Sequence, residues 1–147
     1  MEVTFRKAKR EDIRGIVDLC NECFDEKTSY EYAEKVFLET AMDPNNIYLI
    51  GIENGKIIAH TKISIIRTIF NDMNTYSILN HVCVKPEYRR HNLATRMLEI
   101  IETICIDQEC TSMKLWSNNT RVPAHKCYQK FGFQKEDAGF FEKKIKR

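Results

Sequence analysis

The stretch from His81 to Leu98, HVCVKPEYRRHNLATRML, constrains the fold of this chain more than any other segment. It begins with the apolar run Val82 to Val84, breaks at a proline, and passes through a basic turn into apolar positions with helical spacing. This pattern predicts a strand, a turn and a helix in direct succession. The first N–H groups of a helix lack intrahelical partners and carry the positive end of its dipole, so arginines placed there favour a pyrophosphate. The segment therefore predicts a site for a phosphorylated cofactor.

Two blocks of the sequence resemble a known family. The basic turn, Arg89-Arg90-His91-Asn92-Leu93-Ala94, closely resembles the (Q/R)-x-x-G-x-(G/A) turn of the GNAT superfamily, the acetyl-CoA-dependent N-acyltransferases. The lead-in to this turn is similar to the family's V-x-V-x-P-x-(Y/F) pattern. A second block, RVPAHKCYQKFGF from Arg121 to Phe133, resembles the family's R-x-x-A-H-x-x-Y followed by (L/F)-G-F. The two blocks together carry the resemblance, because a six-residue turn alone is weak evidence.

The turn departs from the family pattern at one position, where Asn92 replaces the usual glycine. Glycine is used where the backbone approaches phosphate closely or takes a positive φ, and asparagine is the next most tolerant residue for that conformation. The turn is therefore expected to form with asparagine, with weaker cofactor binding as one consequence to test. Some family members, including the aminoalkylphosphonate N-acetyltransferases, are similar in carrying asparagine here.

The resemblance implies a GNAT fold in a single domain, 1–147. This is a mixed α+β (α/β) fold with a central mixed, mostly antiparallel twisted sheet and helices on both faces. A chain of 147 residues has the length of one domain. Periodicity alone supports only the coarser α/β or α+β class.

Local patterns predict the order of elements along the chain. The expected strands are 3–6, Ile47 to Glu53 and Lys56 to Arg67 around an Asn54-Gly55 turn, Thr75 to Val84, Ser112 to Ser117, and a last strand or hairpin over 133–136 and 140–145. The expected helices begin at Glu11, after an N-cap at Ser29, near Asn92 and at Val122, the last one ending at Gly132.

Composition excludes several functions. A net charge of +2 gives no broad cationic field, so nucleic acid is not an expected partner. No apolar run is long enough to span a bilayer and the first residues lack a signal-peptide core, so a cytoplasmic protein without a membrane partner is expected. In that compartment the six cysteines are expected to be reduced thiols. Cys20 and Cys23 have C-x-x-C spacing, but no second such pair follows, so packing is the expectation and no metal is predicted.

The resemblance implies that acetyl-CoA is the co-substrate. Backbone groups of Val82, Cys83 and Val84 are expected to hold the pantetheine and thioester, and the turn is expected to hold the pyrophosphate. Cys83 has packing as its expected role, since direct transfer needs no nucleophilic thiol. Asn118 and Asn119 either contact the cofactor or form a turn. The residues implied in cofactor binding are Val82, Cys83, Val84, Arg89, Arg90, His91, Asn92, Leu93, Ala94, Thr95, Asn118 and Asn119.

Two residues are candidates for proton transfer. Tyr128 matches the family tyrosine that protonates the leaving thiolate, with a core position as the alternative. Asn80 and His81 occupy positions where many members carry a carboxylate. His81 can act as a base because an imidazole changes charge near neutral pH. A structural histidine, a water relay and an unidentified carboxylate remain open alternatives.

The predicted function is transfer of an acetyl group from acetyl-CoA directly to a primary amine of a small molecule or protein. The alternative is a GNAT-fold module that binds acyl-CoA or a protein partner without catalysis. Acidic residues between Asp18 and Glu39 favour a cationic acceptor over an aminoalkylphosphonate, although two solvated helix faces explain them equally well. A homodimer is a further expectation from the resemblance.

Overall fold

The computed structural model describes residues 1–146, which form two compact units. The first unit is Met1–Trp116, and the second begins at Ser117. The first contains a five-stranded sheet in the order β1-β2-β3-β4-β5, in which only the β4–β5 pair is parallel. Its elements are β1 (Thr4–Lys7), a 3₁₀ turn (Arg10–Asp12), α1 (Ile13–Phe24), α2 (Tyr30–Thr40), β2 (Asn46–Glu53), β3 (Lys56–Ile66), β4 (Tyr76–Val84), a second 3₁₀ turn (Pro86–Tyr88), α3 (Leu93–Asp107) and β5 (Ser112–Leu115).

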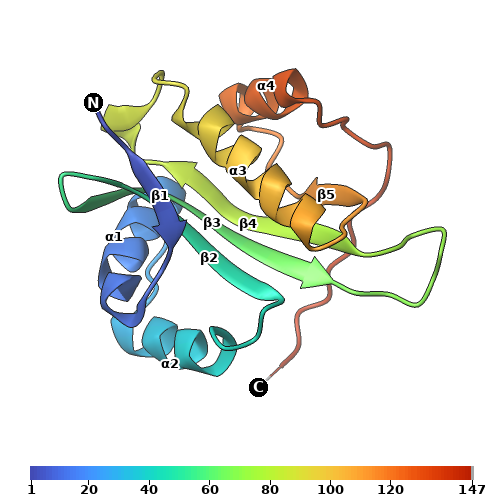
Figure 1. The fold of residues 1–147 in the computed structure, drawn as a ribbon, viewed down its shortest axis with the longest axis horizontal. Helices are drawn as coiled ribbons and strands as arrows, with labels where there is room; N and C mark the ends of the chain where they lie inside the picture. The colour runs from blue at the N-terminus through green and yellow to red at the C-terminus, as the bar shows by residue number, and fades with distance from the viewer. Residues whose placement is uncertain (147) are drawn as a thin grey trace. The chain divides into compact units, whose positions relative to one another are not determined.

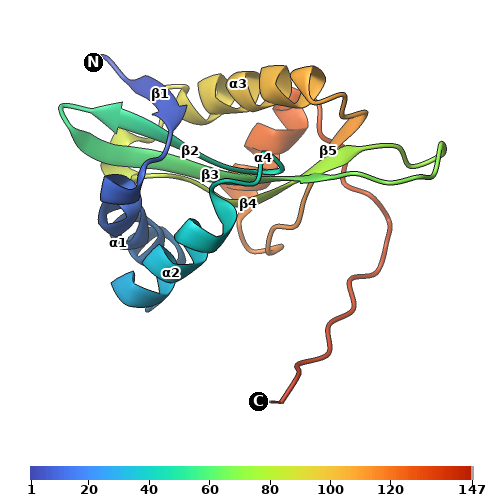
Figure 2. The same cartoon turned by 60° about the horizontal axis from the view of Figure 1, so that its bottom comes forward.

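Helices cover both faces of this sheet. Figures 1 and 2 show α1 and α2 on one face and α3 on the other. The fully buried side chains Met97, Leu98 and Ile101 lie on α3, and Ile50 joins the α1-side cluster. The expected fold, a mixed and mostly antiparallel sheet between helices, is confirmed.

Local sequence signals explain how the elements begin and end. Asn54 and Gly55 have φ angles of 49° and 73°, the double positive φ of the tight turns that join hairpin strands. Ser29 caps α2 as predicted, because its Oγ accepts a hydrogen bond from the N–H of Tyr32 at 3.2 Å. The Asn54-Gly55 turn joins β2 to β3, and the Ser29 cap begins α2.

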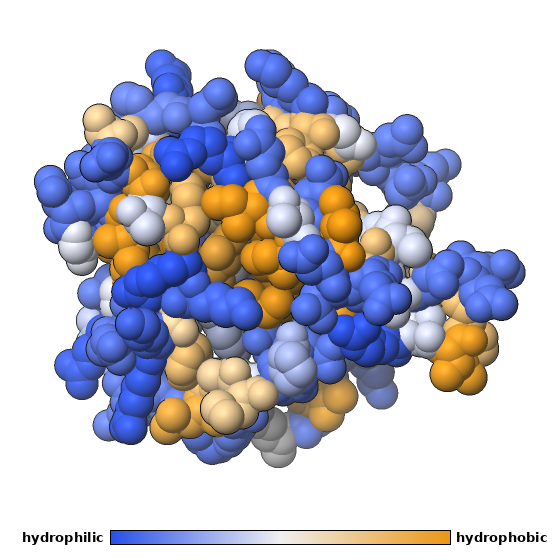
Figure 3. Space-filling model, viewed as in Figure 1, coloured by the Kyte–Doolittle hydropathy of each residue, from blue (hydrophilic) through white to orange (hydrophobic). Residues whose placement is uncertain are grey.

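The loop between β3 and β4 projects beyond the sheet and exposes large apolar side chains (Figure 3). Ile69 is 90% exposed and Phe70 is 65% exposed. The N–H of Asn74 donates a hydrogen bond to the carbonyl oxygen of Phe70 at 2.7 Å, which closes a turn in this loop.

The second unit contains α4 (Val122–Phe131), as predicted. Gly132 ends the helix with a φ of 121°, a backbone angle that favours glycine. The predicted last strand or hairpin over 133–136 and 140–145 is wrong, because the structure has neither strand nor helix in residues 133–146. Phe141 and Ile145 are 93% and 89% exposed. Two short strands without a neighbouring sheet are marginal in water, so alternating apolar residues alone did not specify a strand.

None of the helices among residues 1–146 is both long enough and apolar enough to cross a membrane.

Candidate active site

The end of β4 contains a bulge at His81. The register with β3 pairs Cys83 with His60 and Asn80 with Lys62, so two β4 residues lie opposite the single residue Thr61. His81 has a φ of 50°, a strained conformation for a residue other than glycine. Bulges re-aim side chains and are common next to active sites. Here the bulge breaks the alternation of the strand and leaves Asn80 and His81 both exposed.

The bulge brings the His81 side chain to residues at the end of α1. His81 Nε2 lies 2.9 Å from Oε1 and 3.1 Å from Oε2 of Glu26, and the imidazole packs edge-on against the Phe24 ring at 4.8 Å. The carboxylate favours a proton on Nε2 and leaves Nδ1 as the acceptor nitrogen. This pair can therefore accept a proton at a defined atom.

β4 and β5 pair only along their first halves. The parallel ladder runs from Tyr76–Ser112 to Leu79–Leu115, and the residues of β4 beyond Leu79 have no partner on β5. The predicted cofactor strand, Val82 to Val84, lies in this unpaired part and is buried. Part of its backbone is already used, since Val84 O accepts hydrogen bonds from Arg89 Nε at 3.0 Å and from Cys23 Sγ at 3.7 Å.

The basic turn leads into α3 through two residues with positive φ. Arg90 has a φ of 67° and Asn92, at the N-cap of α3, has a φ of 62°. The predicted tolerance of Asn92 for this conformation is confirmed. No side chain caps the helix among the described residues, so the first N–H groups of α3 are suited to an anion. Arg89, Arg90, His91 and Asn92 are exposed around this helix start, Leu93 is buried, and Ala94 and Thr95 are half-buried.

The remaining predicted site residues belong to the second unit. Tyr128 is 7% exposed and packs edge-on against the Phe133 ring at 5.8 Å. Asn118 Oδ1 accepts hydrogen bonds from the N–H of Thr120 at 2.9 Å and from its hydroxyl at 2.8 Å, the pattern of a turn-forming asparagine. Asn119 Oδ1 accepts from Lys135 Nζ at 3.1 Å. These contacts give both asparagines local structural roles.

The acidic residues of α1 and α2 are largely engaged within the first unit. Asp18 accepts from the hydroxyl of Tyr30 at 2.6 Å, and this bond raises the pKa of the tyrosine. Glu22 lies 2.8 Å from Lys85 Nζ and raises the pKa of that lysine. The acidity of this region is therefore partly neutralised by its own partners, which weakens it as an attractor for a cationic amine.

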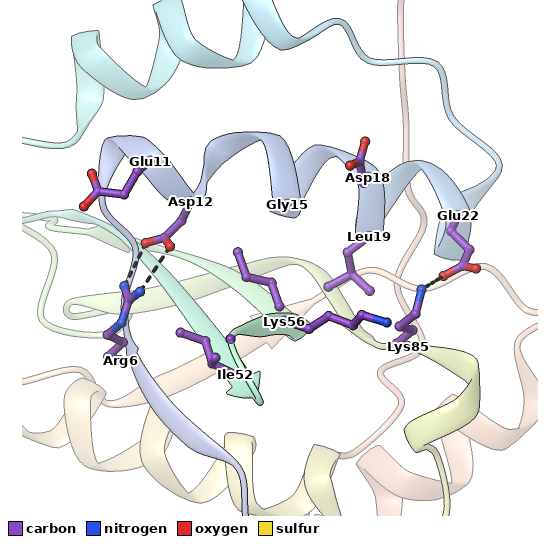
Figure 4. A pocket seen from close by; sticks show the side chains of 12 residues that line it. Arg6, Glu11, Asp12, Gly15, Asp18, Leu19, Glu22, Ile52, Lys56 and Lys85 are labelled. Carbon is purple, nitrogen blue, oxygen red and sulfur yellow. Dashed lines mark hydrogen bonds and ion pairs between the residues drawn. The ribbon is translucent and has the colours of Figure 1, made fainter.

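A cleft of ≈ 640 Å³ lies between α1 and the β2–β3 hairpin (Figure 4). Two ion pairs lie in its lining: Asp12 with Arg6 at one end, and Glu22 with Lys85 at the other. Carboxylates and lysines line it together, so it has no dominant charge. The cleft is distinct in its lining from the bulge and from the α3 turn.

Comparison with known proteins decides the family. A sequence model of the acetyltransferase (GNAT) family matches residues 13–133. The chain belongs to the GNAT acetyltransferase family. Among curated proteins, no sequence matches the chain.

Solved GNAT-like structures share the fold at low sequence identity. Glucosamine-6-phosphate N-acetyltransferase from Arabidopsis thaliana is 18% identical, with a TM-score of 0.84 over 97% of this chain and 99% of that one. Aminoglycoside N-acetyltransferase AAC(6')-Iy in complex with a CoA bisubstrate analogue is 16% identical, with a TM-score of 0.83 over 99% and 100%. A predicted acetyltransferase from Clostridium acetobutylicum, with acetyl-CoA, is 21% identical, with a TM-score of 0.79 over 97% and 96%. In each of these three comparisons at least 96% of either chain is covered.

Sequence reasoning missed the contact between Glu26 and His81. Glu26 lies in the segment between α1 and α2, 55 positions from His81, and appeared there as one of many acidic residues. The bulge also gave no signal, because Asn80 and His81 fit a regular strand as well as a bulged one. In the structure a carboxylate from another segment, Glu26, contacts the histidine at one of the two positions where many family members carry a carboxylate.

Proposed function

We propose that this GNAT protein is an acetyl-CoA-dependent N-acetyltransferase that transfers the acetyl group directly to a primary amine of a small molecule or peptide. The observation that carries the proposal is the bulge of β4, where His81 meets Glu26, on the segment that continues through Val84 and the basic turn to the start of α3, where Asn92 makes no side-chain cap bond. A proton acceptor and an anion-binding turn then lie on one continuous segment. Direct transfer between two bound reactants needs positioning more than an unusual nucleophile.

The cofactor would be held by the first unit. The N–H groups at the start of α3 and the arginines of the turn suit the pyrophosphate, with Arg90 the freer of the two because Arg89 Nε already bonds Val84 O. The pantetheine and the thioester would run along Val82 to Val84, where β4 has no β5 partner. Asn118 and Asn119 are secondary candidates.

His81 would remove the proton from the attacking amine. A nucleophilic amine must lose its proton, and an imidazole suits this step at neutral pH. Glu26 would be a positioning residue, because it bonds Nε2 and so leaves Nδ1 to accept the amine proton. This pairing supplies the carboxylate that the sequence did not reveal.

Tyr128 would protonate the departing CoA thiolate. A tyrosine hydroxyl positioned beside the thiolate can donate its proton as the carbon–sulfur bond breaks. Its burial against Phe133 gives it a second, structural contribution, and a phenylalanine substitution separates the two.

The acceptor would be an amine without a dianionic group. One structural neighbour is named for an aminoglycoside, a cationic amine of the proposed kind, and another for glucosamine 6-phosphate, whose phosphate is the kind of group that the proposal excludes for this chain. The carboxylates around α1 and α2, although Asp18 and Glu22 are already paired, suit a neutral or cationic amine better than an aminophosphonate.

Two measurements test the function. Calorimetry with acetyl-CoA is expected to show binding at low millimolar concentration or below, and its absence would refute the proposal. Release of free CoA thiol is then measured across polyamines, aminoglycosides, amino acids, aminophosphonates and N-terminal peptides, against an enzyme-free blank. Binding without release over this panel would favour the acyl-CoA-binding module instead.

A further inference from the structure

A cluster of thiols and one imidazole lies between α1 and the sheet, where three elements meet. Cys20 comes from α1, His60 from β3 and Cys83 from β4, and all three side chains are buried. Their ligand atoms lie within 4.8 Å of one another. Cys20 Sγ is 3.8 Å from His60 Nδ1.

These separations suit a tetrahedral zinc ion. With Zn–S near ~2.3 Å and Zn–N near ~2.0 Å, tetrahedral ligands lie about 3.5 Å apart for sulfur and nitrogen and about 3.8 Å apart for two sulfurs. The 3.8 Å between Cys20 Sγ and His60 Nδ1 already approaches the first of these distances. Small side-chain movements would therefore place the atoms around an ion.

Cys23 is the candidate for a fourth ligand. It follows Cys20 by three residues on α1, so both side chains project from the same face of the helix. Its Sγ lies 3.7 Å from Val84 O and outside the group of atoms within 4.8 Å of one another, so it would have to turn toward that group to bind the ion. Cys23 is half-buried, which gives an ion a route to the otherwise buried group.

Thiolates are the metal-binding form of cysteine, so Zn²⁺ binding to this cluster would release thiol protons to solvent.

His60 is held with one nitrogen in the cluster. The same Nδ1 that lies 3.8 Å from Cys20 Sγ is 3.0 Å from the His81 carbonyl oxygen, which can only accept, so without a metal Nδ1 carries the proton. An ion at Nδ1 would replace this hydrogen bond and move the proton to Nε2, which is buried without a hydrogen-bond partner among the described residues.

From these contacts we infer that Cys20, Cys23, His60 and Cys83 form a Zn²⁺ site of the Cys₃His type. Three thiolates and an imidazole match the preferences of zinc and are typical of closed structural sites. The site does not include His81 or Tyr128, but Cys83 belongs to the strand whose backbone is proposed to hold the pantetheine, and His60 contacts the His81 carbonyl oxygen. No paired motif marks the site in the sequence, because two of the ligands come singly from two strands.

The test is metal binding by the full-length protein under reducing conditions, without acetyl-CoA or acceptor. Protein purified without chelator is expected to carry one zinc per chain by elemental analysis. Metal-free protein is then titrated with Co²⁺, which should give the thiolate-to-cobalt charge-transfer band and the visible bands of tetrahedral coordination. Folded apo-protein that shows neither band nor zinc uptake would overturn the inference, whatever its transferase activity.

Variants assign the ligands. Cys20→Ala and Cys83→Ala should each weaken Zn²⁺ binding by more than about 100-fold, beyond the 10–100-fold typical of outer contacts. Cys23→Ala should weaken it comparably, and wild-type affinity in that variant would refute the four-ligand site. Cys105→Ala is the matched control, because it removes a buried thiol that bonds Ser77 on the α3 side.

Folding is controlled for by circular dichroism of each variant. If a variant fails to fold, alkylation of Cys23 in the wild-type protein gives an independent readout. Zn²⁺ should slow this reaction at least tenfold, whereas an unchanged alkylation rate at saturating Zn²⁺ would count against the site.

Discussion

The Nε2 atom of His81 lies 2.9 Å from Oε1 of Glu26, which joins the bulge of β4 to the segment between α1 and α2. If His81 is the base, His81→Gln should lower kcat by roughly 10²–10⁴-fold, the usual contribution of general acid–base catalysis. Glu26→Gln should cause a smaller loss in kcat with the KM for acetyl-CoA unchanged, because it acts through the imidazole. Steady-state kinetics measure both effects.

Glu31→Gln is the control for Glu26, since Glu31 is an exposed carboxylate in the first turn of α2. Wild-type kcat in His81→Gln would assign proton removal to water or to another group. Equal losses in Glu26→Gln and Glu31→Gln would reduce the Glu26 contact to a general charge effect.

Arg90 is predicted to hold the cofactor pyrophosphate. Arg90→Ala should raise the Kd for acetyl-CoA roughly tenfold or more, because hydrogen bonds to a charged group are strong. Asn92→Gly should bind acetyl-CoA equally well or better, since glycine takes the observed φ of 62° without strain. Isothermal calorimetry measures both constants, with the exposed Arg10→Ala as the control. A Kd unaffected by Arg90→Ala would remove the arginine from the site.

Tyr128 is predicted to act in the chemical step. Tyr128→Phe keeps the ring and its packing on Phe133 and removes only the hydroxyl, so kcat should fall by roughly 10²–10⁴-fold while the KM for acetyl-CoA barely moves. Thermal unfolding accompanies the kinetics. If Tm and activity fall together, or kcat stays at the wild-type value, Tyr128 is a core residue.

Asp12 is predicted to make stability depend on acid pH. Its carboxylate accepts from Arg6 at 2.7 and 3.1 Å and from the N–H of Lys9 at 2.7 Å, and the Arg6 contact lowers its pKa. A lowered pKa means that this stabilisation is complete above the ordinary pKa of about 3.9 and is lost as the pH falls through the folded-state value. Asp12→Asn should lower the Tm by a few degrees at neutral pH.

The same variant should also have a flatter Tm profile below about pH 4, where the wild-type protein loses the contact. Asp72→Asn, in the exposed loop between β3 and β4, serves as the control. Parallel pH profiles for Asp12→Asn and wild type would contradict the prediction.

Sequence patterns predicted features that depend on neighbouring residues. The Asn54-Gly55 turn and the Ser29 cap were predictable because a few adjacent residues decide them. The positive φ of Asn92 was predictable, because asparagine stands where the family uses glycine and is one of the few residues that tolerate this angle. The contact of Glu26 with His81 and the meeting of Cys20 with Cys83 depend on how α1 lies on the sheet, which no local pattern encodes. The last hairpin failed for the same reason, since a strand needs a partner as well as a pattern.

The extra residue in β4 reverses the face of the sheet to which each later side chain of the strand points. Ser77 faces α3, where it bonds Cys105, and in an unbroken strand Cys83 would face the same way. Instead Cys83 meets Cys20 of α1. Deleting one residue at the bulge would give a regular strand in which Cys83 still pairs with His60 and still faces α1, while the re-aimed position that brings His81 to Glu26 would be lost. A change of one residue in the length of β4 is therefore enough to remove or create the His81–Glu26 contact, with nearly the same composition and the same order of elements.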